Sequence, residues 1–195
     1  MSSTQGFGGG FSTNLGNDGF GSGFSYSKPR ITYLPGLKAD RYTQGYFADD
    51  MTWFDDKVPT STTYPTSVIE DPLTDDGSFF SRRWTGYFRP LETGTYTFYM
   101  SSDDASYMWL GQPAVSGWSA LNAVINNGGL HGYNEVQSSP INLQAGQYYP
   151  IQVLFGENGG GDALSLSYST ATTSKTTDLT NLIFYNPNAG DGRGI

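Results

Sequence analysis

The sequence contains no cysteine and a single histidine, His131. Without thiols the chain can form neither a disulfide nor a thiolate metal site, and one imidazole is too few for an ordinary zinc site. No apolar run approaches the roughly 20 residues of a membrane-spanning helix, so we expect no membrane insertion. The first residues lack a basic stretch followed by an apolar one, which predicts no secretory signal peptide.

Positive charge is also scarce. The 195 residues include ten Lys and Arg against 18 Asp and Glu, giving a formal net charge of −8. Nucleic acid binding depends on basic side chains that neutralise phosphates, so we expect no nucleic acid partner. Arg82 and Arg83 are adjacent, but in a strand their side chains would point to opposite faces. An acidic chain of this kind suits cations or neutral sugars as ligands.

Helical periodicity is absent as well. The chain is rich in glycine and aromatic residues, a composition that favours strands and turns, and no sustained three-to-four-residue apolar period occurs. The sequence therefore predicts an all-β fold, an antiparallel β-sandwich. We expect the Gly- and Asn-rich residues 112–138 to cover one edge of a sheet. Alternating segments predict strands at residues 79–90, 96–102, 106–111, 148–156 and 163–168.

The composition divides the chain into three parts, which we expect at residues 1–30, 31–185 and 186–195. The first part is a Gly/Phe-rich arm that cannot bury enough surface to fold alone. Such a terminus frays unless it is tied down, so we expect residues 1–27 to bind other subunits of a larger assembly. The alternative is an arm folded back on its own domain. The expected assembly anchors are Phe7, Phe11, Phe20 and Phe24.

The adjacent pair Asp103 and Asp104 lies between two segments of alternating apolar residues. Two neighbouring carboxylates at a turn between strands repel each other unless a positive charge or a proton relieves them. A calcium ion can do so, because Ca²⁺ is bound by carboxylate and carbonyl oxygens. The pair therefore indicates a Ca²⁺ site, and the alternative is a solvated acidic turn.

The stretches Trp84–Phe98 (WTGYFRPLETGTYTF) and Ser102–Gly111 (SDDASYMWLG) resemble the PA14 family. Residues 36–42 resemble that family's opening strand and residues 148–166 its closing hairpin, so the resemblance covers about residues 31–170. It implies a β-sandwich module of the kind found in fungal and bacterial adhesins. In the lectin members of the family, an Asp-Asp pair joined by a cis peptide holds Ca²⁺, and the ion binds vicinal sugar hydroxyls.

The resemblance also implies a second loop that contributes an Asn side chain and backbone carbonyls to the ion. In this chain that loop is Gly156–Asp162 (GENGGGD), and Asn158 is the expected side-chain ligand. Glu157 and Asp162 are alternatives to Asn158. Glycines in the loop would let carbonyl oxygens approach the ion or the sugar closely. The expected ligand-binding residues are Asp103, Asp104, Glu157, Asn158, Gly159, Gly160 and Asp162.

Aromatic side chains offer a possible sugar-stacking platform. Trp109, Trp118 and Tyr133 are the candidates, although aromatic residues at strand ends are more often packed into a core. A hydrolase is the least supported function class. No pair of facing carboxylates can be identified from sequence spacing, and no nucleophile elbow is present.

Three function classes follow: a glycan-binding module, a structural assembly protein and a hydrolase. We expect a non-enzymatic adhesion protein that binds cell-surface glycans through Ca²⁺. Its composition is similar to that of tailed-phage virion proteins with PA14-like modules, which places it at a virion surface or outside the cell. The alternatives are a structural virion decoration or tail protein without sugar binding, and an excised lectin domain of a larger adhesin.

Overall fold

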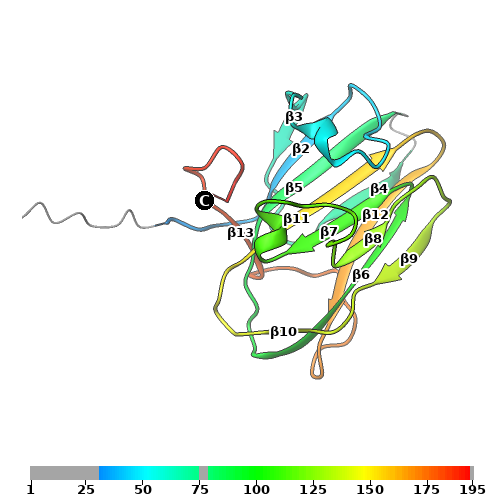
Figure 1. Cartoon of the computed structure of the whole chain (residues 1–195). Coiled ribbons are helices and arrows are strands. Elements are labelled where there is room, and N and C mark those ends of the chain that lie inside the picture. The colour runs from blue at the N-terminus through cyan, green and yellow to red at the C-terminus, as the bar shows by residue number, and fades with distance from the viewer. Residues whose placement is uncertain (1–30, 75–78, 194–195) are drawn as a thin grey trace, which may run out of the picture. The chain divides into compact units, whose positions relative to one another are not determined.

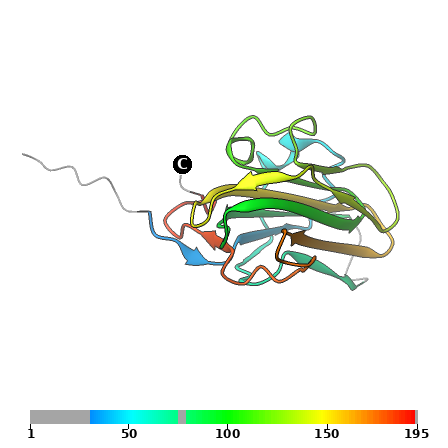
Figure 2. The same ribbon diagram turned by 90° about the horizontal axis from the view of Figure 1, so that it is seen from below.

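The computed structural model describes residues 31–74 and 79–193. These residues form two antiparallel β-sheets that pack face to face (Figures 1 and 2). Two short 3-10 helices, η1 (Met51–Phe54) and η2 (Gln112–Ala114), are the only helical elements in this part of the chain. The expected all-β sandwich is thereby confirmed.

The larger sheet has eight strands, with β5 and β11 at its centre. β5 and β11 pair along their whole lengths, from Phe80 opposite Glu157 to Phe88 opposite Tyr149. The strands of this sheet are β1 (Leu34–Pro35), β2 (Lys38–Tyr42), β3 (Ser61–Thr63), β5 (Phe80–Phe88), β7 (Ser106–Leu110), β8 (Ile125–Asn127), β11 (Tyr149–Glu157) and β13 (Ile183–Tyr185).

The smaller sheet has five strands, and β6 pairs with β12 at its centre. Apolar residues of β6 and β12 alternate with polar ones, as expected for strands with one face in a core and one in solvent. The strands of this sheet are β4 (Glu70–Thr74), β6 (Gly94–Asp103), β9 (Asn134–Gln137), β10 (Ile141–Leu143) and β12 (Asp162–Ser169).

The main core lies between the two sheets. Its fully buried members include Trp84 and Phe155 from the larger sheet and Phe98, Met100 and Leu166 from the smaller one. Burial of such side chains contributes about 1.5–3 kcal/mol each. This interface fixes the register of the strands, because a shift by one residue would turn every core side chain to the solvent.

A second apolar cluster lies over the other face of the larger sheet, beneath the segment that contains η1. It includes Phe47 and Phe54 from that segment and Tyr107, Trp109 and Leu154 from β7 and β11. The irregular residues 43–60 are thus held in place by their own aromatic side chains.

Residues 112–138 were expected to cover one edge of a sheet. In the structure they contribute a strand to each of the two sheets. Their strand β8 pairs with β7 of the larger sheet, and β9 pairs with β6 of the smaller one. The segment therefore crosses from one sheet to the other (Figure 1). The crossing residues 128–133 pass beside the connection between β6 and β7, which contains the acidic pair.

Candidate functional site

Asp103 and Asp104 lie where β6 ends and the chain turns into β7. Asp103 is half-buried and Asp104 is 7% exposed. The peptide bond that joins them is cis, as the resemblance to the PA14 lectins implies. Asp104 is held by backbone N–H groups from two loops: His131 N donates to Oδ1 at 3.0 Å and Asn158 N donates to Oδ2 at 3.1 Å. Both carboxylate oxygens of Asp104 therefore have fixed directions.

Glu157, the last residue of β11, brings a third carboxylate to the pair. One carboxylate oxygen from each of Asp103, Asp104 and Glu157 lies within 4.8 Å of the others. The Glu157 side chain is fully buried. Its Oε1 accepts a hydrogen bond from Gly159 N, and its Oε2 has no hydrogen-bond partner among the described residues. A buried carboxylate oxygen without a partner is unfavourable unless a ligand completes it.

The electrostatics of the cluster follow from this burial. The pKa of Glu157 is raised to about 7, chiefly by burial and further by the charges of Asp104, Asp103 and Asp162, against the opposing Gly159 N–H. Burial and the charge of Asp104 also raise the pKa of Asp103, while His131 and the Tyr133 N–H oppose that rise. Within the described chain, none of the three clustered carboxylates forms an ion pair with a lysine or arginine.

This donor set fits a calcium ion. Three carboxylates supply hard oxygen donors, and Ca²⁺ prefers oxygen ligands. The unpartnered Oε2 of Glu157 is the strongest single indication, because a cation would complete its coordination. An ion here would also relieve the repulsion that, after burial, helps to raise the pKa values of Asp103 and Glu157.

The remaining residues predicted from the second loop lie around the cluster. Asn158 is half-buried, and its backbone N–H contacts Asp104; a metal contact of its side chain stays a prediction. Gly159 and Gly160 have φ values of 142° and 112°, which favour glycine. Asp162 begins β12, is 1% exposed and acts on Glu157 through its charge. Of the alternatives to Asn158, the structure brings the Glu157 side chain to the aspartate pair.

Sequence reasoning missed the role of Asp49. Its Oδ1 accepts from the hydroxyl of Tyr107 at 2.9 Å, and its Oδ2 accepts from Gly129 N at 3.0 Å. Asp49 thus fastens the segment that contains His131 and Tyr133 to β7. The only signal in the sequence is an acidic residue in an irregular segment, which cannot identify a partner 80 residues away.

The expected aromatic platform is only partly available. Trp109 is fully buried, and its indole N–H donates to Ser119 O at 2.9 Å. Trp118 packs edge-on against Trp109, with ring centroids 5.6 Å apart. Tyr133 is 59% exposed and follows the loop that caps Asp104. Trp109 therefore belongs to the core, as aromatic residues at strand ends commonly do, and Tyr133 is the exposed member of the three.

Some expectations fall on residues outside the described ranges. The proposed anchors of the arm, Phe7, Phe11, Phe20 and Phe24, all precede residue 31. Among the described residues, no helix has the length and apolar character needed to cross a membrane.

Comparison with known proteins supports the fold, and a family match covers the part of the chain that contains the acidic cluster. Residues 80–170, which run from β5 to β12, match the family described as the GLEYA domain. No curated protein matches the sequence.

Solved structures show the same fold. The Epithelial Adhesin 9 A domain from Candida glabrata, determined in complex with Galb1-4GlcNAc, is 16% identical, with a TM-score of 0.63 over 85% of this chain and 96% of that one. The PA14 domain of the MpAFP antifreeze protein is 16% identical, with a TM-score of 0.60 over 86% and 95% of the two chains.

An anti-sigma factor domain-containing protein from Clostridium clariflavum is 20% identical, with a TM-score of 0.59 over 82% of this chain. The chain spans only about half of that protein, 51% of its length. These likenesses confirm the resemblance to the PA14 family at the level of the fold. The chain is a PA14-like β-sandwich that is similar, over residues 80–170, to the GLEYA domain.

Proposed function

We propose that the chain is a non-enzymatic, Ca²⁺-dependent glycan-binding domain. The observation that carries the proposal is the cluster of Asp103, Asp104 and Glu157, in which a buried oxygen of Glu157 has no hydrogen-bond partner within residues 31–74 and 79–193. The fold adds support, because an adhesin domain with the same fold was determined in complex with Galb1-4GlcNAc. The match to the GLEYA domain includes all three carboxylates.

Asp103, Asp104 and Glu157 would hold the ion. Ca²⁺ takes about 6–8 oxygen ligands, so it would offer positions to two neighbouring sugar hydroxyls. The chain's own contribution is preorganisation. The N–H groups of His131 and Asn158 fix the Asp104 carboxylate before any ligand arrives, and the exposed ring of Tyr133 can stack on the apolar face of a sugar.

The acidic cluster lies far from the first described strand of the sandwich, β1. Glu157 ends β11, whereas Tyr149 begins it, about 27 Å away for nine residues. Tyr149 lies opposite Phe88, which also pairs with Ile183 of β13, and β13 pairs with β1. The described chain therefore enters the sandwich at the end opposite the acidic cluster (Figure 1).

We further propose that residues 1–30 attach the domain to a larger assembly, with Phe7, Phe11, Phe20 and Phe24 as anchors. The setting at a virion surface stays a prediction. The alternatives are a structural protein that uses the fold without binding sugar, and a lectin domain belonging to a larger adhesin. The two experiments below distinguish these possibilities.

The first experiment applies the protein to a glycan array with Ca²⁺ or with a chelator, beside Asp104→Asn and the control Asp178→Asn. Asp178 is an exposed carboxylate outside the cluster. Wild type and the control should bind glycans only with Ca²⁺, and Asp104→Asn should not bind. Absence of glycan binding by the wild type with Ca²⁺ would favour the purely structural function.

The second experiment deletes residues 1–27. The truncated protein should remain folded and keep its Ca²⁺ affinity, because the site and the core lie within the described residues. It should no longer join its assembly, as measured by co-sedimentation. A truncated protein that still assembles would exclude the arm as the anchor.

A further inference from the structure

We propose that a polar groove on the outer face of the smaller sheet is a second binding subsite, which takes the continuation of a neutral oligosaccharide whose terminal sugar lies at the acidic cluster. This inference rests on the proposed function. To that function it adds the length and charge of the glycan and a set of protein contacts outside the acidic cluster.

The strand register connects the groove to the acidic pair. In β6 the core side chains are those of Tyr96, Phe98, Met100 and Ser102. Asp103, Ser101 and Tyr99 alternate with them and therefore share the outer face. Ser101 and Asp103 are consecutive residues of that face, about 7 Å apart along the strand.

The strands on either side of β6, which are β9 and β12, place further side chains next to this row. Ser101 pairs with Ser165 of β12 on one side and with Glu135 of β9 on the other, and Tyr99 pairs with Ser167. The row from Asp103 to the level of Ser167 is four residues long, about 13 Å. It is long enough for several linked sugar rings to follow it.

A groove of about 490 Å³ lies over the part of this row that contains Ser101, Ser165 and Ser167. It is lined by Ser101, Ser165 and Ser167 from the sheet, by the exposed Tyr133, and by Glu135 and Lys175. Tyr133 belongs to this lining, and its backbone N–H lowers the pKa of Asp103. On β6, Ser101 of this lining is the neighbour of Asp103 on the outer face of the sheet.

The chemistry of the lining favours sugar hydroxyls. The hydroxyls of Ser165, which is half-buried, and of Ser167, which is 6% exposed, line the groove and form no hydrogen bond with any other residue of the described chain. Ser101 Oγ donates to Glu135 Oε2 at 3.0 Å, and Lys175 Nζ donates to Glu135 Oε1 at 2.7 Å. Serine hydroxyls can both donate and accept, which matches the hydroxyl groups of a carbohydrate.

The charge and polarity of the groove lining restrict the class of ligand further. Glu135 and Lys175 neutralise each other, and Lys175 Nζ lies 4.6 Å from the ring centre of Tyr99. The groove thus has no unpaired cation for a sulfated or phosphorylated glycan, and the net charge of −8 repels polyanions. A protein partner is disfavoured, because stable interfaces have an apolar centre and Tyr133 is the only large exposed apolar residue of this lining.

The test compares short and long sugars. The probes are galactose and mannose, each beside a linear tetrasaccharide that ends in the same sugar, measured by calorimetry with saturating Ca²⁺. For the sugar that binds, we expect the tetrasaccharide to bind about tenfold more tightly than the monosaccharide. Ser165→Trp should fill the groove and remove this gain without changing the affinity for the monosaccharide or for Ca²⁺.

Thr97→Trp is the matched control, because Thr97 lies on the same face but outside the groove. It should keep the gain. Should Ser165→Trp fail to fold, the amide signals of Ser101, Ser165 and Ser167 in the wild-type protein give a second readout. The tetrasaccharide should shift them and the monosaccharide should not.

Two outcomes separate this inference from the proposed function. Equal affinities for the monosaccharide and the tetrasaccharide, with binding still dependent on Ca²⁺, would overturn the subsite and leave the glycan-binding function intact. Failure of every sugar on the array to bind with Ca²⁺ would overturn the proposed function and the subsite together.

Discussion

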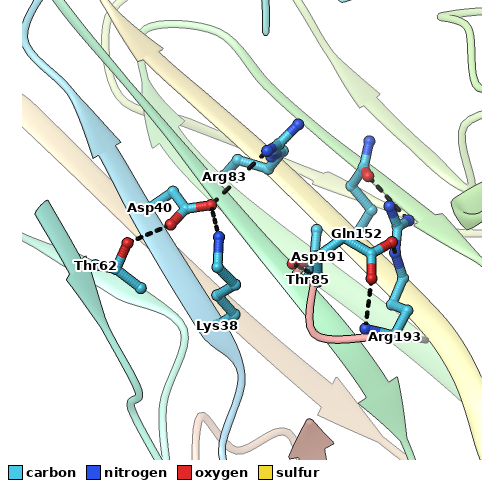
Figure 3. Close-up of polar contacts among 8 residues, drawn as sticks. All are labelled: Lys38, Asp40, Thr62, Arg83, Thr85, Gln152, Asp191 and Arg193. Atoms are coloured by element: carbon cyan, nitrogen blue, oxygen red, sulfur yellow. Dashed lines mark hydrogen bonds and ion pairs between the residues drawn. The ribbon is translucent and has the colours of Figure 1, made fainter. Parts of the chain in front are cut away.

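Buried carboxylates occur in two regions of this molecule, and the two regions differ in the partners that surround the carboxylates. On β2 of the larger sheet, Asp40 has a side chain that is 1% exposed. It accepts hydrogen bonds from Lys38 and, at 2.6 Å, from Thr62 Oγ1, and Arg83 Nη2 lies 3.7 Å away (Figure 3). In the cluster of Asp103, Asp104 and Glu157, the described partners are uncharged N–H groups.

The same region also pairs a buried cation. Arg193 is 7% exposed, and its guanidinium donates to Asp191 and, at 3.1 Å, to Gln152 Oε1 (Figure 3). The hydroxyl of Thr85 donates to the carbonyl oxygen of Asp191 at 2.6 Å, which fastens the C-terminal segment to β5. Buried charge in this region is therefore satisfied from within the chain.

The presence or absence of a charged partner distinguishes a structural carboxylate from one that binds a ligand. A buried charge is strongly destabilising without a partner, so a fold selected only for stability supplies one, as it does for Asp40. The acidic cluster contains three carboxylates, and no lysine or arginine of the described residues pairs with any of them. Groups held in such an unfavourable state are typical of binding sites. The comparison therefore indicates that the missing charge comes from a ligand.

The largest expected effect is on metal affinity. Glu157→Gln removes a carboxylate from the cluster and should weaken Ca²⁺ binding by about 100-fold or more, since even outer-shell partners of a metal contribute about 10–100-fold. Isothermal titration calorimetry measures the change. Glu135→Gln, at an exposed carboxylate paired with Lys175, is the control and should keep the wild-type affinity. Equal losses in the two variants would contradict the assignment.

The second effect concerns Asp40. Asp40→Asn leaves Lys38 and Arg83 without their carboxylate and should lower the free energy of unfolding by about 3 kcal/mol. This corresponds to a fall in Tm of about 6–12 °C for a domain of this size. Its Ca²⁺ affinity should equal that of wild type, and Asp55→Asn, at an exposed position, should change neither property. Loss of Ca²⁺ binding in Asp40→Asn would break the distinction between the two regions.

The fold and part of the site could be predicted from the sequence because the signals are local. Alternation at residues 79–90 and 148–156 predicts β5 and β11, and the adjacent pair Asp103 and Asp104 marks the turn after β6. The loop after β11 was also identified. Local patterns could not decide which side chain of that loop faces the pair, and the structure brings Glu157 there.

The contacts that could not be predicted join distant parts of the chain. Asp49 with Gly129 and Asp40 with Arg83 are pairs whose spacing carries no periodic signal. The crossing of residues 112–138 between the sheets depends on two short strands, β8 and β9. Strands this brief are set by their neighbours more than by their own residues.

The third prediction is stabilisation by the ion itself. A ligand that binds only the folded state adds about 2.7 kcal/mol at a concentration 100 times its Kd. Addition of Ca²⁺ at that level should therefore raise the Tm of wild type by about 5–11 °C, as measured by scanning calorimetry. Asp40→Asn should gain as much as wild type, whereas Glu157→Gln should gain little. A similar gain with Mg²⁺ alone would indicate nonspecific screening of charge.

The smallest expected effect is on the pH dependence of the stability of the Ca²⁺-free protein. The direction in which stability changes with pH distinguishes the cluster from an ordinary surface carboxylate. Burial and neighbouring charges raise the pKa of Glu157 to about 7 in the folded state, from 4.5. The folded protein therefore binds this proton more tightly than the unfolded chain does. The corresponding stability is fully present below about pH 4.5 and is lost as the pH rises through about 7. Lys175, by contrast, lowers the pKa of Glu135, so the contribution of Glu135 is lost as the pH falls.

Thermal unfolding between pH 5 and 8 in the presence of a chelator tests this sign. The Tm of wild type should fall across the interval relative to that of Glu157→Gln, which lacks the titrating group. Saturating Ca²⁺ should reverse the slope, because a metal ion binds carboxylates in their deprotonated form. Parallel Tm curves for wild type and Glu157→Gln would show that Glu157 titrates as an ordinary carboxylate. The clustered acids would then be as well satisfied as Asp40, and the reason to assign them a cation would be lost.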